Sequence, residues 1–190
     1  MNIIQRVCQE CMQQQTAYCC KSRCNFTEYR CVTRYSGDIK KLLTNFKFCG
    51  KVHYGQLLAS LLFRNIARMP FLQKIDFIIP VPMTAKKRIQ RRYNQAEIIA
   101  THLSKKMQVY CMKRNLVKIK NTKNQSSLSK EQRKQNVRNV FHLVNKSSLY
   151  QKNILLIDDI CTTGNTLQAC IKALKTAKCK NIYIATIAYG

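Results

Sequence analysis

The pattern of apolar and polar residues predicts helices and short buried strands along most of the chain. Apolar residues recur at helical spacing in 38–48 and in 55–66, and 94–107 is expected to form a further helix. A short apolar run stopped by prolines, 76–82, is typical of a buried parallel strand that ends in a loop. The longest uncharged apolar stretch, 52–63, is shorter than the roughly 18 residues of a membrane span. We therefore expect no membrane span and assign this stretch to a buried helix.

The last part of the chain predicts a strand at 153–157, a helix at 166–178 and a strand at 181–188. Parallel strands joined by a crossover helix form a right-handed βαβ unit. A polar segment rich in Lys, Arg, Asn, Gln and Ser, 113–139, precedes this unit and is expected to be exposed or mobile. After it, 140–144 is expected to rejoin the sheet. The pattern as a whole predicts an α/β fold with a parallel sheet flanked by helices.

The strongly positive net charge indicates what kind of partner the chain binds. The 190 residues include 34 Lys and Arg against 8 acidic residues, a net charge of +26. Phosphates, nucleic acid or anionic lipid are the expected partners, and a basic surface that binds nothing specific is the alternative. Segment 86–138 has sixteen basic residues against Glu97 and Glu131, a net +14 over 53 residues, which exceeds the need of one diphosphate. This excess favours non-specific binding to a nucleic-acid backbone.

Cysteines are concentrated near the N-terminus, where six of the 11 lie within the first 31 residues. No secretory signal is visible, so we expect a cytoplasmic protein with reduced or metal-bound thiols. Four thiolates in two closely spaced pairs favour a tetrahedral structural zinc site. The candidate ligands are Cys8, Cys11, Cys20 and Cys24. Cys19 can replace Cys20, and free thiols are the alternative to zinc. We expect a zinc-finger-like module in 1–35 and the main domain in 36–190.

Residues 154–166 join an apolar strand to two carboxylates and a loop of small polar residues. Asp158 and Asp159 follow four aliphatic residues, at the strand end where open α/β sheets bind ligands. Gly164 permits backbone conformations in which N–H groups converge on an anion, and a helix that begins near Thr166 adds free N–H groups. Two carboxylates repel a bare phosphate but accept hydrogen bonds from sugar hydroxyls. The pattern predicts a ribose 5-phosphate site, and an ordinary turn with a threonine N-cap is the alternative.

This segment resembles the signature with which type I phosphoribosyltransferases bind phosphoribosyl pyrophosphate (PRPP). The resemblance implies that Asp158 and Asp159 hold the ribose 2′ and 3′ hydroxyls. It assigns the 5′-phosphate to Thr162, Thr163, Gly164, Asn165 and Thr166. It places the pyrophosphate loop in 82–92, where the candidate cations are Lys86, Lys87, Arg88, Arg91 and Arg92. It also implies a type I fold with a mobile hood, here 113–139, and Mg²⁺ as the companion of PRPP.

Further motifs make the resemblance to the ComF family nearly continuous along the chain. They are Ile79-Pro-Val-Pro82, Arg92-Tyr-Asn-Gln-Ala-Glu97, Gln125 with Leu128 and Ser129, and Arg133 with Asn136 and Phe141. Members of this family usually open with a zinc finger and have glycine at the position of Arg92. The arginine here predicts a different local backbone.

The resemblance implies a PRPP-binding protein that acts in natural competence, DNA uptake and the handling of single-stranded DNA. Two other functions stay open. One is a metabolic, Mg²⁺-dependent phosphoribosyltransferase with an amide or nucleobase acceptor. The other is a non-catalytic basic module that docks on nucleic acid or on competence and DNA-uptake proteins. Tyr93 and Tyr110 are the candidate platforms for stacking single-stranded bases, and Tyr93 can equally belong to the core.

Overall fold

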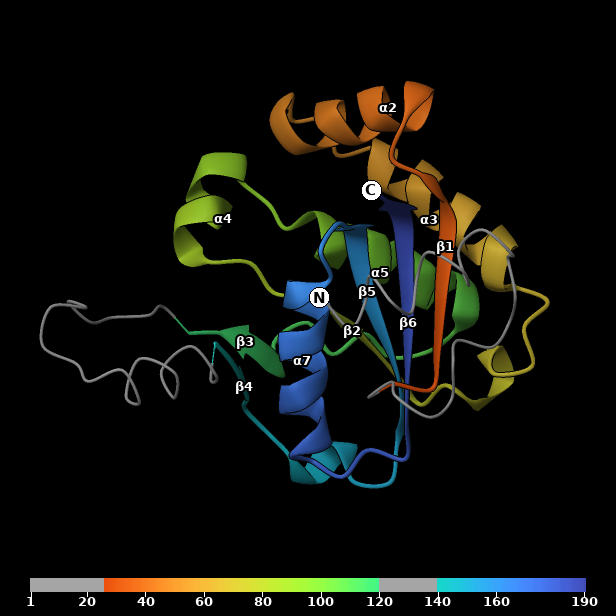
Figure 1. Ribbon diagram of the computed structural model, residues 1–190, viewed down its shortest axis with the longest axis vertical. Coiled ribbons are helices and arrows are strands. Elements are labelled where there is room, and N and C mark those ends of the chain that lie inside the picture. The colour runs from red at the N-terminus through yellow and green to blue at the C-terminus, as the bar shows by residue number, and fades with distance from the viewer. Residues whose placement is uncertain (1–25, 120–139) are drawn as a thin grey trace, which may run out of the picture.

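A parallel sheet with helices on both faces forms the centre of the computed structural model, which describes residues 26–119 and 140–190 (Figure 1). The strands and helices are β1 (Glu28–Arg34), α2 (Gly37–Phe48), α3 (Tyr54–Ile66), β2 (Phe77–Pro80), α4 (Ala85–Arg91), α5 (Gln95–Met107), β3 (Leu116–Lys118), β4 (Phe141–Leu143), β5 (Asn153–Cys161), α7 (Asn165–Lys175) and β6 (Asn181–Tyr189). Short 3₁₀ turns cover Leu72–Lys74 and Ser147–Leu149. The predicted α/β class is confirmed.

The main sheet has the strand order β1-β6-β5-β2, and all its neighbouring strands are parallel. In β5, residues 154–157 are all buried, and β6 is buried along nearly its whole length. Such continuous apolar runs are required because helices cover both faces of the sheet. The crossover from β5 through α7 to β6 is the predicted βαβ unit. Since the strands are parallel, their carboxyl ends meet at one edge, where the predicted ligand residues lie.

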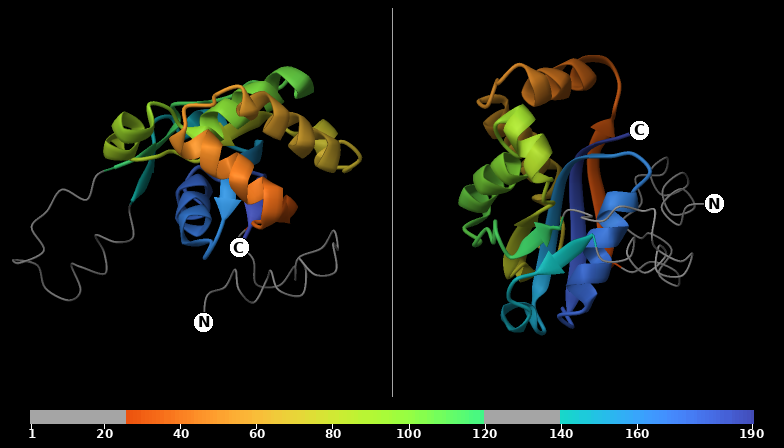
Figure 2. Two further views of the ribbon diagram at one scale, coloured as in Figure 1. Left: turned by 90° about the horizontal axis from the view of Figure 1, so that it is seen from above. Right: turned by 90° about the vertical axis from the view of Figure 1, so that its left-hand side faces the viewer.

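Each face of the sheet has its own apolar core, and Figure 2 shows the helices on either side. On one face, Leu156 and Ile184 pack with α7 residues such as Leu167 and Ile171. On the other face, the residues next in sequence, Leu155 and Ile157 among them, pack with α2, α3 and α5. Consecutive residues of a strand point to opposite faces, so alternate residues of β5 belong to the two different cores.

Helix α3 lies close to α5 and supports α2 above it. A Cβ atom at Gly55 would collide with the side chain of Ile98, so the glycine permits this close approach. The residues Leu58, Leu62 and Ile66 are fully buried. This confirms the predicted buried helix, and no helix in the described parts of the chain is long and apolar enough to cross a membrane.

The structure corrects the predicted position of 140–144. Strand β4 does not rejoin the main sheet, because it pairs antiparallel with β3 in a separate two-stranded sheet. Phe141 and Leu143 are buried against the α7 core while His142 is exposed, so this hairpin covers α7 with one face. Leu116 of β3 is also buried, although it lies in the segment predicted to be exposed. The rest of that segment, 120–139, lies outside the described residues.

The last part of the range 1–35 was predicted to belong to the zinc-finger-like module, but it forms strand β1 of the main sheet. Residues 28–34 form an edge strand of the main sheet, with Cys31 beside Thr186 of β6. The four candidate zinc ligands, at 8, 11, 20 and 24, lie outside the described residues. Within the described residues, no cluster of three or more His, Cys, Asp or Glu side chains is arranged to hold a metal.

Candidate functional site

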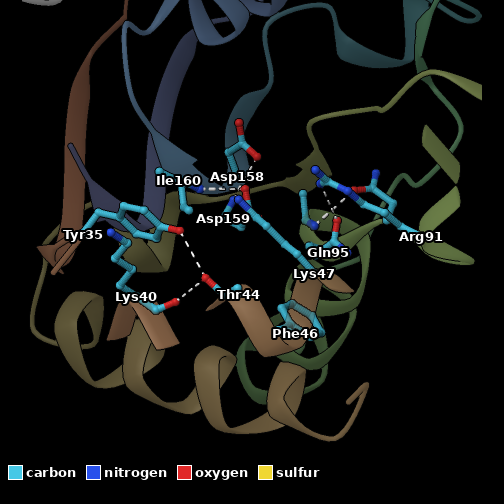
Figure 3. Close-up of polar contacts among 12 residues, drawn as sticks. Tyr35, Lys40, Thr44, Phe46, Lys47, Arg91, Gln95, Asp158, Asp159 and Ile160 are labelled. Carbon is cyan, nitrogen blue, oxygen red and sulfur yellow. Dashed lines mark hydrogen bonds and ion pairs between the residues drawn. The ribbon is translucent and has the colours of Figure 1, made fainter. Parts of the chain in front are cut away.

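The acidic pair lies inside β5, which continues beyond the predicted end at 157 to Cys161. Both carboxylates accept a backbone N–H: Asp159 N donates to Asp158 Oδ1 at 2.9 Å, and Ile160 N donates to Asp159 Oδ1 at 2.8 Å. Figure 3 shows the two side chains diverging, as expected for consecutive residues of a strand. Asp159 is directed towards α2. Asp158 lies near α7, where burial, and then the charge of Asp158, raise the pKa of the Cys170 thiol.

Lys47, near the C-terminal end of α2, is the cation that the structure brings to the acidic pair. Its Nζ is 3.1 Å from Asp159 Oδ2, and the two side chains are 15% and 12% exposed. Asp158 has a different environment. Its burial, and then the negative charge of Asp159, raise the pKa of Asp158 well above the ordinary value of a carboxyl group. One carboxylate is therefore neutralised by an ion pair and the other resists ionisation, so the pair repels a nearby phosphate less than two free carboxylates would.

The phosphate loop has the backbone that the sequence predicted. Gly164 has φ 71° and ψ 0°, in the left-handed region that favours glycine, and it is the N-cap residue of α7. Because glycine has no side chain to cap the helix, the first N–H groups of α7 are available to an anion. The four polar side chains assigned to the phosphate are all exposed; they are Thr162, Thr163, Asn165 and Thr166. Loop and helix together form an anion-binding turn at the end of β5.

The predicted cations of 82–92 fall into different environments on and beside α4. Lys86 and Lys87 are exposed. Arg88 Nη2 lies 2.6 Å from Glu97 Oε2, so this guanidinium already has a partner. Arg91 is only partly exposed, and its side chain is directed towards Lys47 and the acidic pair in Figure 3. It donates from Nη1 to Gln95 Oε1 at 3.4 Å. Arg91 is thus the cation of α4 with the best-defined position beside the site.

Arg92 corrects the expectation of a different local backbone. It has φ 66° and ψ −19° at the C-terminal end of α4, in the left-handed region where glycine is usual. The chain therefore keeps a glycine-like backbone with an arginine. For a residue with a Cβ, this conformation costs roughly 1–2 kcal/mol.

The Asn-Gln motif ties α5 to the end of β2. Asn94 Oδ1 accepts from Ala96 N at 3.1 Å as an N-cap, and its Nδ2 donates to the carbonyl of Val81 at 2.9 Å. Gln95 is 2% exposed, and its Nε2 has no acceptor within the described structure. The motif is consequently part of the wall of the site.

The two predicted stacking platforms differ in position. Tyr93 packs against Phe46, with ring centroids 5.6 Å apart, and its hydroxyl donates to the carbonyl of Phe46, so it is fixed against α2. Tyr110 is 69% exposed. Sequence reasoning missed a further aromatic, Phe48, which is 63% exposed and has the guanidinium of Arg91 5.1 Å from its ring centroid.

Sequence reasoning also missed Lys47, although one signal was present. Lys47 follows the fully buried Leu43 by four positions and therefore lies on the apolar face of α2. A lysine there needs a partner, since unpaired buried lysines are rare. Cys161, the last residue of β5, is a small side chain beside the loop. It is 2% exposed, and burial raises the pKa of its thiol to about 11, so the thiol stays protonated near neutral pH.

Comparison with known proteins places this geometry in a family. Residues 93–190 match the model of the phosphoribosyl transferase domain. The chain is 29% identical over 175 residues to competence protein F of Haemophilus influenzae. This match covers 90% of this chain and 76% of that protein. It is 26% identical over 139 residues to DNA utilization protein YhgH of Salmonella typhimurium, covering 72% of this chain and 60% of that protein.

A third relative is competence protein ComFC of Bacillus subtilis, which is 26% identical over 171 residues. That match covers 90% of this chain and 67% of the relative. The chain thus spans between 60% and 76% of the length of these three proteins. The parallel sheet, the crossover and the glycine turn are those of the type I phosphoribosyltransferase fold. The chain belongs to the phosphoribosyl transferase domain family and, within it, to the ComF family.

Proposed function

We propose that the protein binds a phosphoribosyl ligand, PRPP or a related ribose 5-phosphate, and acts in DNA uptake and the handling of single-stranded DNA. One observation carries the first part of this proposal. The left-handed turn at Gly164 leads from the acidic pair of β5 directly into the N-terminus of α7. A turn that donates N–H groups to a phosphate therefore lies beside two carboxyl groups that accept hydrogen bonds from sugar hydroxyls, as a ribose 5-phosphate requires.

The charges around this site suit the rest of PRPP. Arg91 is the best-placed candidate for the diphosphate, because Gln95 and the ring of Phe48 hold its guanidinium. The described residues contain no protein metal cluster, and Asp159 is already paired with Lys47. Mg²⁺ would be bound by the diphosphate, whose charge it would neutralise. The geometry supports binding of the phosphoribosyl group, rather than transfer to a particular acceptor.

Calorimetric titration of PRPP with Mg²⁺ tests this proposal. We expect a binding heat with the wild-type protein and none with Asp158→Asn/Asp159→Asn. Asp38→Asn is the matched control, since Asp38 is a fully exposed carboxylate on α2 that pairs only with Lys41 among the described contacts. Equal binding by the wild type and the double variant, or no heat with the wild type, would contradict the proposal.

Handling of single-stranded DNA is supported by the names of the relatives, by the net charge of +26 and by Phe48. An exposed aromatic ring with a guanidinium over it offers a platform for a base, and basic residues offer contacts to the backbone. Fluorescence anisotropy of a labelled oligonucleotide at increasing salt tests this part. Affinity should fall steeply with salt, and Phe48→Ala should weaken it further, by about fivefold or more. Affinity that does not depend on salt would exclude a backbone-binding surface.

We further propose that Cys8, Cys11, Cys20 and Cys24 bind one structural zinc ion in a cytoplasmic protein, where thiols stay reduced. Competence and DNA-uptake proteins are the proposed protein partners. Atomic emission should find one zinc per chain. The choice between Cys19 and Cys20 is decided by comparing Cys19→Ser with Cys20→Ser, of which only the second should lose the metal. Full zinc content in both variants would rule out this ligand set.

A further inference from the structure

The ion pair between Lys47 and Asp159 is a buried charge contact at the proposed ribose site. The distance is 3.1 Å, and both side chains are at least 85% buried. Removing such charges from water costs several kcal/mol, so a pair of this kind needs good geometry to persist. The Lys41–Asp38 pair on the same helix is different, since both of its side chains are 80% exposed or more.

The position of Lys47 is fixed from two sides. Phe46, the preceding residue, is fully buried in the core between α2, α3 and α5. The hydroxyl of Tyr93 donates to the carbonyl of Phe46 and so holds the last turn of α2. Helix α2 precedes the region that matches the phosphoribosyl transferase domain, 93–190. A segment outside the matched domain therefore delivers a cation to the acidic pair.

The ion pair leaves Asp159 able to accept a further hydrogen bond. Its Oδ2 contacts Lys47, and its Oδ1 accepts the N–H of Ile160. Each carboxylate oxygen can accept two hydrogen bonds, so a sugar hydroxyl still finds an acceptor. Two free carboxylates next to a phosphate would otherwise need an added cation to offset their repulsion.

We propose that Lys47 is the resident counter-ion of the acidic pair. It orients Asp159 for a ribose hydroxyl and allows the site to take up a ribose 5-phosphate group without a divalent cation at the carboxylates. This inference rests on the proposed function and deepens it. Lys47 acts through Asp159 and is therefore a positioning residue. Mg²⁺ is then required only by the diphosphate of PRPP.

Calorimetric titration of ribose 5-phosphate, with Mg²⁺ and in EDTA, tests the inference on four proteins: the wild type, Lys47→Met, Lys47→Arg and Lys41→Met. The Kd of the wild type should change less than about twofold when Mg²⁺ is removed. In EDTA, Lys47→Met should bind about tenfold more weakly, which corresponds to about 1.4 kcal/mol, and Mg²⁺ should restore part of the loss. Lys47→Arg should bind nearly as the wild type, and Lys41→Met should be unchanged.

A wild type that binds ribose 5-phosphate only with Mg²⁺ would overturn the inference, whether or not Lys47→Met folds. The inference would also be overturned if Lys47→Met bound ribose 5-phosphate as tightly as the wild type in EDTA. A loss of affinity in Lys47→Met that Mg²⁺ does not reduce would overturn it too, because it indicates a purely structural lysine. Failure of the proposed function gives another result. In that case the wild type binds neither ribose 5-phosphate nor PRPP with Mg²⁺.

Discussion

The phosphate loop of 154–166 and the basic segment of 82–92 both carry residues predicted to bind parts of one ligand, yet they are built differently. In the loop, strand, carboxylates, glycine turn and helix N-terminus follow one another along the chain. In the basic segment, five cations close in sequence have separate environments: Lys86 and Lys87 are exposed, Arg88 is paired with Glu97, and Arg91 contacts Gln95. Contiguous sequence determines a site when the backbone forms it, whereas side chains on a short helix depend on distant partners.

The largest effect of breaking the loop is expected from Gly164→Ala. The alanine must adopt φ 71° as the N-cap residue, at a cost of roughly 1–2 kcal/mol, or the turn must change. We expect ribose 5-phosphate affinity to fall by about tenfold or more in calorimetric titration, because the N–H groups of the turn no longer converge. Affinity equal to that of the wild type would show that the loop does not hold the phosphate.

The basic segment is tested by comparing Arg91→Ala with Lys86→Ala. Arg91 is held beside the site by Gln95, while Lys86 is exposed on α4. PRPP affinity should fall by about tenfold for Arg91→Ala, the scale of a charge-assisted contact, and by less than about twofold for Lys86→Ala. Equal losses in both variants would mean that the segment acts through its overall charge rather than through one placed guanidinium.

Asp158 in the loop region predicts a dependence of stability on pH. Its pKa is raised in the folded protein by burial and by Asp159, so its contribution to stability is present at low pH. That contribution is lost as the pH rises from the ordinary carboxyl range through the raised pKa. Urea unfolding should therefore show Asp158→Asn to be more stable than the wild type at pH 7. The difference should close as the pH falls towards about 4. A difference that is constant with pH would contradict this account.

The smallest effect is expected from removing the backbone strain at Arg92, at the end of the basic segment. Arg92→Gly removes the cost of a left-handed arginine but adds the chain entropy of glycine. The net gain in the free energy of unfolding should be about 0.5–1 kcal/mol. Arg92→Ala retains the Cβ and serves as the control without this gain. Equal stability of both variants would show that Arg92 is unstrained.

Much of this molecule follows from local sequence. The helical periods of α2 and α3, the apolar run of β5 and the turn at Gly164 each depend on neighbouring residues, and the structure contains all of them. Pairing between distant segments was harder to predict from the sequence. Strand β4 was placed in the wrong sheet because three residues give no clue to their partner, and β1 was grouped with the cysteines beside it. Lys47 is far from the acidic pair in sequence, so only the packing of α2 shows the contact.

The most direct test of the central claim is an NMR titration of the labelled 22.1 kDa protein with ribose 5-phosphate, followed through its backbone amide signals. We expect the largest shifts at residues 162–166 and at Asp159, where the phosphate and a sugar hydroxyl should bind. Shifts confined to the exposed basic residues of α4, with the 162–166 amides unchanged, would contradict it.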